Sequence, residues 1–379
     1  MSAPVRIALT HAFCWPEVRR GAERFGPELA AALARRGHEV VHYSAAWDPA
    51  AALEAGPPGV TAVRIRRRWS DQYRHEADFG RRLLPRLAGR PFDAVHSLGR
   101  HDALASIRAA RLRGDGRRTV VTDLGIPDPV WMRQQGWFQA RAVARVVTGI
   151  EVYSAMSRTA VEALASGYGR RDGVIVPGGV DLGAFAATRS RSPRPVILFS
   201  GAITEPRKGV AVLLEALPAV AASEPDVELW LSGPGDVEPL LARAPAGARE
   251  RVRALGTGDA AAQPERYARA WVTCLPSVDD SFGMALLESL ACGTPLVTTT
   301  HSAPQELVNE GVTGTLCPPS DPAALAAACL RGLALARRPE TATACRAAAE
   351  PYDWDRGLAP LCEALYARGA SARAGFAPG

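Results

Sequence analysis

The chain has 379 residues, of which 47% are hydrophobic and 22% are charged. This length is enough for two globular domains, and no apolar run of about 18 residues is present to cross a membrane. The net charge of +6 comes from basic residues spread among 39 acids, without a recognised nucleic-acid-binding motif. We therefore expect no transmembrane segment and no nucleic acid partner.

The first thirteen residues enter a strand-like run directly, and they lack the successive basic, apolar and small-residue parts of a signal peptide. The seven cysteines form an odd set without a CxxC pair, and several lie in apolar runs. Both observations favour a cytoplasmic protein with reduced, mostly buried thiols. No group of His, Cys and acidic residues has metal-ligand spacing, so the sequence predicts no metal site.

Short apolar runs alternate with helical periodicity along the first half, which is typical of βα units around a parallel sheet. A helix is predicted over 22–37, with a closing glycine as its C-cap. The strands are predicted at 5–11, 39–45, 61–66, 92–98, 119–125, 150–156 and 173–179.

A polar, proline-containing stretch then interrupts the pattern, and we place a linker at 188–195. Five more strands are predicted at 196–202, 227–233, 252–258, 272–278 and 295–301. The predicted fold class is α/β, with two doubly wound domains that face each other across a cleft. Their expected ranges are 1–187 and 196–355, and residues 356–379 are interpreted as a helix and tail that could cross back to the first domain.

The segment VDDSFGMALLESLACGTPLVTTT, residues 278–300, carries the strongest chemical pattern in the chain. After a strand it supplies Asp280, and Gly283 then opens a helix that contains Glu288. The start of a helix attracts anions through its free N–H groups and its dipole. A carboxylate such as Glu288 can accept two hydrogen bonds from a vicinal diol such as ribose, and Asp280 could accept hydroxyl groups of a second sugar.

This segment resembles the nucleotide-binding domain of the retaining GT-B glycosyltransferases of family 4, which write it E-x-F-G-x-x-x-x-E followed by G-x-P. Here the first acid is Asp280 instead of glutamate, and Gly293 and Pro295 complete the pattern. The resemblance implies a nucleoside diphosphate sugar, such as a UDP- or GDP-sugar, as the second substrate, with no separate cofactor. It assigns to the donor Ser281, Phe282, Gly283, Met284 and Glu288, together with Gly233 of the LSGPGD stretch.

Lys208, in the stretch TEPRKGV, is the only lysine of the chain. It matches the family lysine that holds the donor diphosphate, a task that suits a compact ammonium on a flexible stem. The family arginine that shares this task is Ala202 here, so either Arg207 replaces it or diphosphate binding is weaker. The EPRKG sequence is similar to that of bacterial phosphatidylinositol mannosyltransferases. The stretch VIVPGGVDLGAF resembles another family motif, with Gly178 in place of asparagine.

On the acceptor side, residues 10–25 resemble the family's glycine loop, with Arg20 in place of its first glycine and Gly21 retained. Asp123 stands where many relatives have histidine. Together with Asp102 and Asp128 it favours a basic acceptor such as an aminocyclitol, although it could instead cap a turn. His96 and His101 are further acceptor-side candidates, although each could instead be a structural histidine.

The catalytic candidates are therefore Lys208, Asp280 and Asp123, in a retaining transfer that does not need a metal ion. A phosphatidylinositol or other lipid acceptor is the alternative to the basic small molecule. A nucleotide-sugar epimerase and a binding subunit without turnover remain as further alternatives. The protein is expected to be a monomer or a homodimer.

Overall fold

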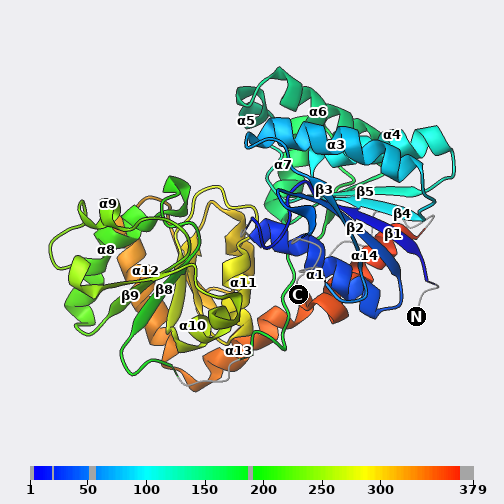
Figure 1. Cartoon of the computed structure of the whole chain (residues 1–379). Helices are drawn as coiled ribbons and strands as arrows, with labels where there is room; N and C mark the ends of the chain where they lie inside the picture. The colour runs from blue at the N-terminus through cyan, green and yellow to red at the C-terminus, as the bar shows by residue number, and fades with distance from the viewer. Residues whose placement is uncertain (1–3, 19–20, 51–56, 187–190, 368–379) are drawn as a thin grey trace. The chain divides into compact units, whose positions relative to one another are not determined.

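The computed structural model describes residues 4–18, 21–50, 57–186 and 191–367. The chain divides into two compact units (Figure 1): unit 1 comprises residues 1–179 and 354–379, and unit 2 comprises residues 180–353. The first boundary lies before the predicted linker at 188–195, because residues 180–186 belong to unit 2. The chain leaves unit 2 after Asp353, and its last helix lies in unit 1.

Unit 1 is built on a seven-stranded sheet with the order β3-β2-β1-β4-β5-β6-β7, in which every pair is parallel. All seven strands coincide with predicted runs. Their bounds are β1 Arg6–Thr10, β2 Glu39–Ala46, β3 Thr61–Arg66, β4 Ala94–Ser97, β5 Arg118–Asp123, β6 Val152–Ala155 and β7 Val174–Ile175.

Helices cover both faces of this sheet, which is why its central strands are apolar runs and do not alternate. In Figure 1, α3 and α4 lie over one face and α1 and α14 over the other. The helix bounds are α1 Gly21–Arg35, α3 Gln72–Ala88, α4 Arg100–Arg113, α5 Pro129–Gln134, α6 Trp137–Gly149, α7 Arg158–Tyr168 and α14 Ala359–Tyr366.

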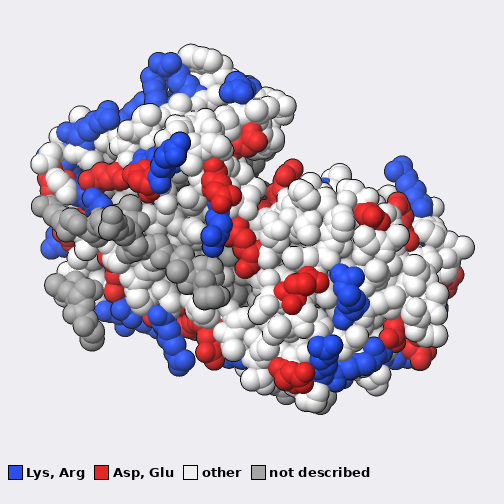
Figure 2. All heavy atoms as spheres, turned by 180° about the vertical axis from the view of Figure 1, so that it is seen from behind, with Lys and Arg blue, Asp and Glu red and all other residues white. Residues whose placement is uncertain are grey.

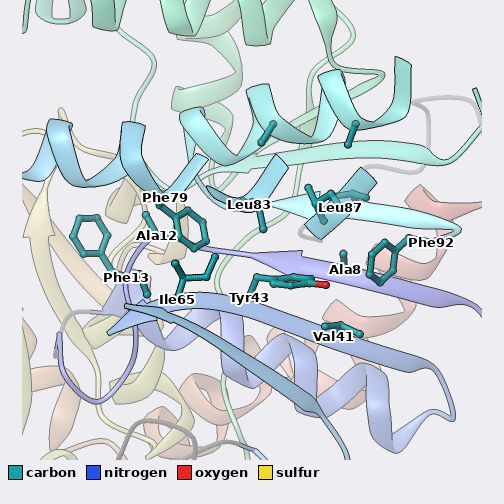
Figure 3. Close-up of a cluster of buried hydrophobic side chains, with 14 residues drawn as sticks. Ala8, Ala12, Phe13, Val41, Tyr43, Ile65, Phe79, Leu83, Leu87 and Phe92 are labelled. Carbon is teal, nitrogen blue, oxygen red and sulfur yellow. The ribbon is translucent and has the colours of Figure 1, made fainter. Parts of the chain in front are cut away.

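Figure 3 shows the part of the core between β1–β3 and α3, where aromatic and aliphatic side chains interlock. Phe79, Leu83 and Leu87 point from α3 onto Tyr43 of β2 and Ile65 of β3, and all five are at most 2% exposed. Full burial of such side chains contributes roughly 1.5–3 kcal/mol each, so this layer fixes α3 on the sheet.

Helix α14 and the residues just before it make polar contacts with earlier elements of unit 1. The Tyr366 hydroxyl lies 2.8 Å from Nδ1 of His96 in β4. Glu363 accepts hydrogen bonds from Arg36 and, at 2.8 Å, from His38. Just before the helix, the Trp354 indole donates to Glu28 of α1 at 2.8 Å. The end of the described chain is thus held by elements from its beginning.

Unit 2 contains a six-stranded parallel sheet with the order β10-β9-β8-β11-β12-β13. Five strands coincide with predicted runs, and the sixth, β13, was not predicted as a strand. The bounds are β8 Val196–Ser200, β9 Glu228–Ser232, β10 Val252–Gly256, β11 Val272–Leu275, β12 Leu296–Thr299 and β13 Gly314–Cys317.

The helices of unit 2 also lie on both faces of their sheet, α8 and α12 on one and α10, α11 and α13 on the other (Figure 1). Their bounds are α8 Val210–Ser223, α9 Glu238–Leu241, α10 Gln263–Arg269, α11 Met284–Ala291, α12 Pro322–Ala336 and α13 Pro339–Ala349. Both units are therefore doubly wound, as the alternating sequence pattern predicted.

All seven cysteines are buried and free. No helix within the described residues has the length and apolar character needed to span a bilayer. Acidic and basic side chains are interspersed over most of the face shown in Figure 2.

Candidate active site

The candidate donor residues of unit 2 lie in loops that follow β8, β9 and β11, except Met284 and Glu288, which lie on α11 directly after the last of these loops. Ligands of doubly wound sheets bind at this carboxyl edge. Two contacts join the loops: the Val278 amide donates to the Arg207 carbonyl at 2.8 Å, and the Ile203 amide donates to the Pro234 carbonyl at 2.9 Å. The edge is thus one hydrogen-bonded assembly.

Gly209 allows the loop after β8 to pass close to the loop after β11. It adopts φ +76°, and a Cβ added there would lie 2.3 Å from the Pro276 carbonyl oxygen. The preceding turn, Pro206–Lys208, is a short 3-10 helix that presents Arg207 and Lys208. Only glycine satisfies both the left-handed backbone and the close approach.

Asp280 brings the two cations of this turn together. Lys208 Nζ lies 2.7 Å from Asp280 Oδ2, and Arg207 Nη1 lies 3.3 Å from Asp280 Oδ1. The Asp280 and Lys208 side chains are 11% and 15% exposed, whereas Arg207 is 42% exposed and also binds Glu205 at 2.6 Å. Two cations thus face two carboxylates, Asp280 and Glu205, and an anionic ligand at this surface could exchange with either carboxylate for the cations.

The two cations also set the protonation of Asp280. Burial on its own raises the pKa of this carboxyl group, but the charge and hydrogen bond of Lys208, followed by those of Arg207, outweigh burial and lower it. The Asp280 backbone is fixed as well, since its amide donates to the Ser302 hydroxyl at 3.1 Å. Asp280 therefore remains ionised near neutral pH.

Gly283 starts α11 in a left-handed conformation, with φ +92°. A Cβ at this position would lie 3.0 Å from the Pro304 ring. Ser281, Gly283 and Met284 are partly exposed, whereas Phe282 is buried with its ring centroid 5.9 Å from that of Tyr352. The first amides of α11 thus follow Asp280 directly, at the positive end of the helix.

Glu288 lies within α11 and is 6% exposed. Its Oε2 accepts a hydrogen bond of 2.8 Å from the Tyr267 hydroxyl. Tyr267, on α10, is 1% exposed and lies 3.0 Å from the Ser200 hydroxyl at the end of β8. Tyr267 therefore orients the Glu288 carboxylate, and no sequence motif indicated this residue.

Gly233 lies at the end of β9, where φ is +139°. A Cβ there would lie 1.9 Å from the Gly201 carbonyl oxygen, so no side chain fits. Next to it, Arg266 Nη1 donates to the Ser232 hydroxyl at 2.6 Å and to the Gly256 carbonyl at 3.0 Å. Arg266 is a second residue of this edge that the sequence did not indicate.

In unit 1, Asp123 ends β5 and is 7% exposed. Its Oδ1 accepts from the Gly125 amide at 3.0 Å, and its Oδ2 accepts from the Tyr153 hydroxyl at 2.8 Å. Arg100 Nη2 lies 4.0 Å from Oδ1. The structure thus shows the turn-capping role of Asp123, and its negative charge is balanced within unit 1.

Asp102 and Asp128 also have structural roles. Asp102 is 1% exposed, and its Oδ2 accepts from the Thr10 hydroxyl at 2.8 Å. Burial raises the pKa of Asp102 to about 7 in spite of that hydrogen bond. Asp128 caps α5 by accepting from the amides of Val130 and Trp131 at 2.6 and 2.9 Å. Neither carboxylate is directed by these contacts toward a basic ligand.

The acceptor-side assignment of His96 requires a correction, because its side chain is 0% exposed. Its two ring nitrogens lie 2.8 Å from the Tyr366 hydroxyl and 2.7 Å from Thr122 Oγ1, and burial lowers its pKa to about 3. It is a neutral core histidine and cannot touch an acceptor in this structure.

The structure also describes two other acceptor-side candidates, His101 and Gly21. His101 is half-buried, with Nε2 3.3 Å from Gln139 Oε1. Gly21 is the first residue of α1. Arg20 lies outside the described residues. Within the described ranges, no group of three or more His, Cys, Asp or Glu side chains has the arrangement of a metal site.

Comparison with known sequences identifies the family. Residues 19–184 match the sequence family described as Glycosyltransferase Family 4, and residues 194–334 match the one described as Glycosyl transferases group 1. The chain belongs to the family 4 glycosyltransferases. The two matches together extend over most of both units, and the second contains Lys208, Asp280 and Glu288.

Two kinds of curated relative illustrate the range of similarity. The phosphatidyl-myo-inositol mannosyltransferase of Mycobacterium leprae is 36% identical over 55% of this chain and 56% of its own length. The chain thus matches little more than half of that relative. The D-inositol 3-phosphate glycosyltransferase of Xylanimonas cellulosilytica is 28% identical over 91% of each chain.

Solved structures share the GT-B fold. Anabaena HepE in complex with UDP and glucose is 19% identical, with a TM-score of 0.75 over 95% of this chain and 99% of HepE. Sucrose-phosphate synthase from Thermosynechococcus elongatus is 21% identical, with a TM-score of 0.75 over 96% of this chain and 98% of the synthase. At these identities the likeness establishes the fold of the chain and not its substrates.

Proposed function

We propose that this glycosyltransferase moves a sugar from a nucleoside diphosphate donor to a hydroxyl group of an acceptor, with retention of the anomeric configuration. The observation that supports the proposal most directly is the pairing of Lys208 and Arg207 with Asp280, just ahead of α11. Cations and a helix start are both devices by which proteins bind a diphosphate.

In this proposal Lys208 and the first amides of α11 bind the diphosphate, and Arg207 supplies the second cation in place of the arginine absent at Ala202. The 42% exposure of the Arg207 side chain leaves its guanidinium accessible to a phosphate oxygen. Glu288, oriented by Tyr267, accepts hydrogen bonds from the ribose hydroxyls. Asp280 keeps both cations in place and accepts a hydroxyl of the transferred sugar.

The transfer breaks the bond between the anomeric carbon and the diphosphate oxygen and forms a bond from that carbon to the acceptor oxygen. The acceptor proton passes to the departing diphosphate oxygen on the same face of the sugar. Lys208 and Arg207 lower the barrier by stabilising the negative charge that develops on the leaving group. This cluster supplies the charge that a metal ion supplies in other transferases, so we expect turnover without added magnesium.

We further propose an inositol-containing acceptor, free, phosphorylated or as part of a phospholipid. The names of two relatives support this choice, since they act on phosphatidyl-myo-inositol and on D-inositol 3-phosphate. A basic acceptor such as an aminocyclitol rested on the charge of Asp123. Because that carboxylate already accepts from Gly125 and Tyr153 and lies 4.0 Å from the Arg100 guanidinium, the basic acceptor is the second choice.

The test is an incubation with a panel of UDP- and GDP-sugars, each with myo-inositol, inositol phosphate, phosphatidylinositol or an aminocyclitol. Mass spectrometry identifies the product, and NMR determines its anomeric configuration. Lys208→Ala and Glu288→Ala should each lower the rate roughly 100-fold or more, with or without EDTA. Arg249→Ala is the control, because Arg249 forms an exposed ion pair with Glu238 in the same unit.

Unchanged rates in both variants would refute the assignment of the site. Donor binding without transfer to any acceptor would instead indicate a binding subunit. An isomerised donor without an acceptor would indicate an epimerase, and an inverted product would refute retention.

A further inference from the structure

Large hydrophobic side chains are exposed together on one short stretch of unit 1. Val130 and Trp131 of α5 are 55% and 46% exposed, and Trp137 and Phe138 of α6 are 63% and 79% exposed. We call these four residues the α5–α6 patch. Single exposed apolar residues are common on proteins, but four large ones within the stretch 130–138 point to an interaction site.

The local fold holds this patch outward. Asp128 caps α5, and Gly136, at φ +105°, turns the chain directly into α6. On α6 the inward face is Gln139, Ala142, Val143, Val146 and Val147. Trp137 and Phe138 lie on the other side at the first turn, with their ring centroids 4.9 Å apart. Burial of the inward face fixes the helix, so the aromatic pair cannot turn into the core.

The charged side chains within residues 129–150 are all arginines, and the flanking acids in sequence are Asp128, which caps α5, and Glu151. Arg133 of α5 and Arg141 and Arg145 of α6 are exposed, and residues 129–150 contain no acid. Trp137, Arg141 and Arg145 are spaced four residues apart and therefore line one strip of the helix. The Arg141 guanidinium lies 5.3 Å from the Trp137 ring centroid. Figure 2 shows basic and uncharged atoms along the upper rim of unit 1, where these helices lie.

The three arginines beside the patch differ from those that carboxylates hold in place. No ion pair to any of them occurs among the residues that the structure describes, whereas Arg35, Arg113 and Arg170, for example, each bind a carboxylate within 3 Å. Their charge is therefore available to an external anion. A strip that combines unpaired arginines with exposed tryptophan and phenylalanine fits the boundary between lipid headgroups and acyl chains.

We propose that the α5–α6 patch docks unit 1 on the surface of an anionic lipid bilayer, with Trp137 and Phe138 inserted at the headgroup level and the three arginines on lipid phosphates. A protein partner is less favoured, because four partly exposed side chains offer less than the roughly 800 Å² per partner of a stable interface. A membrane needs no such area, since repeated headgroups supply the matching charge. The proposal does not depend on the transfer reaction.

The experiment is sedimentation of the full chain with vesicles of phosphatidylcholine alone or mixed with phosphatidylglycerol. The protein should sediment with the anionic vesicles only, and less so at high salt. Arg141→Glu/Arg145→Glu should weaken binding by roughly fivefold or more per residue. Trp137→Ser/Phe138→Ser should weaken it by roughly tenfold or more, because the inserted apolar area is lost.

Leu112→Ser is the matched control, because Leu112 is 71% exposed on α4 of the same unit, away from the patch in sequence. It should bind vesicles like the original chain, and circular dichroism should show that all variants are folded. Failure of the original chain to bind anionic vesicles, or equal binding by Trp137→Ser/Phe138→Ser, would overturn the proposal. A dimer in the absence of vesicles that this double variant dissociates would assign the patch to self-association and would also overturn it. None of these readouts requires a sugar donor, so they separate this proposal from that of the transfer activity.

Discussion

Lys208 Nζ donates to Asp280 Oδ2 at 2.7 Å, although the two residues are 72 positions apart in the chain. The only lysine and the acid that replaces the family's glutamate are thus direct partners. A donor diphosphate would therefore meet an ammonium whose position is already fixed, and little side-chain freedom would be lost on binding. The same contact gives the first prediction.

Asp280→Asn should destabilise the protein by roughly 1–3 kcal/mol at pH 7, because two charged hydrogen bonds to a buried carboxylate become weaker. The folded-state pKa of Asp280 is lowered, so this stabilisation is fully present above the unfolded pKa of about 3.9 and is lost as the pH falls through the lower folded value. Urea unfolding from pH 7 to pH 3 measures both effects. The variant should lose less stability than the original chain on acidification; equal losses would contradict the prediction.

Tyr267→Phe should raise the donor KM several-fold without abolishing turnover, because Glu288 loses the hydroxyl that orients it. The loss of hydrogen bonds to Glu288 and Ser200 should also cost about 1 kcal/mol of stability. Steady-state kinetics with varied donor, together with urea unfolding, tests this. Tyr43→Phe, in the core of unit 1, is the control and should leave the donor KM unchanged. A Tyr267→Phe variant with an unaltered donor KM would mean that Glu288 is oriented by other contacts.

Gly209→Ala should destabilise unit 2 by about 3 kcal/mol or more, since its Cβ would lie 2.3 Å from the Pro276 carbonyl oxygen. The matched control is Gly247→Ala, because Gly247 has φ +77° and nothing within 4 Å of an added Cβ. Backbone strain alone should cost the control about 1 kcal/mol. Thermal unfolding of both variants separates the two effects, and equal losses would show that the loop after β8 can move aside.

Asp102→Asn should stabilise the protein at pH 8 by up to about 4 kcal/mol, because the folded-state pKa of Asp102, about 7, lies far above its unfolded value. The stabilisation from the protonated acid is complete below pH 4 and is lost as the pH rises through 7. The advantage of the variant should therefore shrink at pH 5. Denaturant unfolding at the two pH values is the measurement, with the exposed Asp128→Asn as control. A stability difference that did not change with pH would argue against a buried, readily protonated Asp102.

The parallel sheets were predictable from sequence because a strand covered by helices on both faces is a short apolar run between turn residues. The predicted strand runs of both units lie where the structure has strands. Among the described residues, β13 is a strand that the sequence did not predict. Its four residues, Gly314–Cys317, begin with glycine and contain threonine. Its pairing with β12 decides that it is a strand, and pairing between distant segments leaves no local signal.

The sequence could predict those features of the candidate site that lie within a single segment, but not the contacts between segments. The resemblance to the family motifs indicated Lys208, Asp280 and Glu288, but not that Asp280 would hold Lys208 and Arg207, since the contact joins separate loops. Tyr267 was missed because its role depends on a helix that packs beside α11. His96 was misplaced because a histidine at a strand end has the same sequence signature whether it faces a ligand or, as here, Thr122 and Tyr366.

The position of α14 has a consequence for dissecting the protein. Because residues from 354 onward return to unit 1, unit 2 is an insertion into unit 1, and a cut after Gly179 would strip the amino-terminal fragment of Trp354 and Tyr366. A stable isolated fragment should instead need the carboxyl-terminal segment joined back by a short peptide in place of unit 2, whereas residues 180–353 can be excised as one continuous piece.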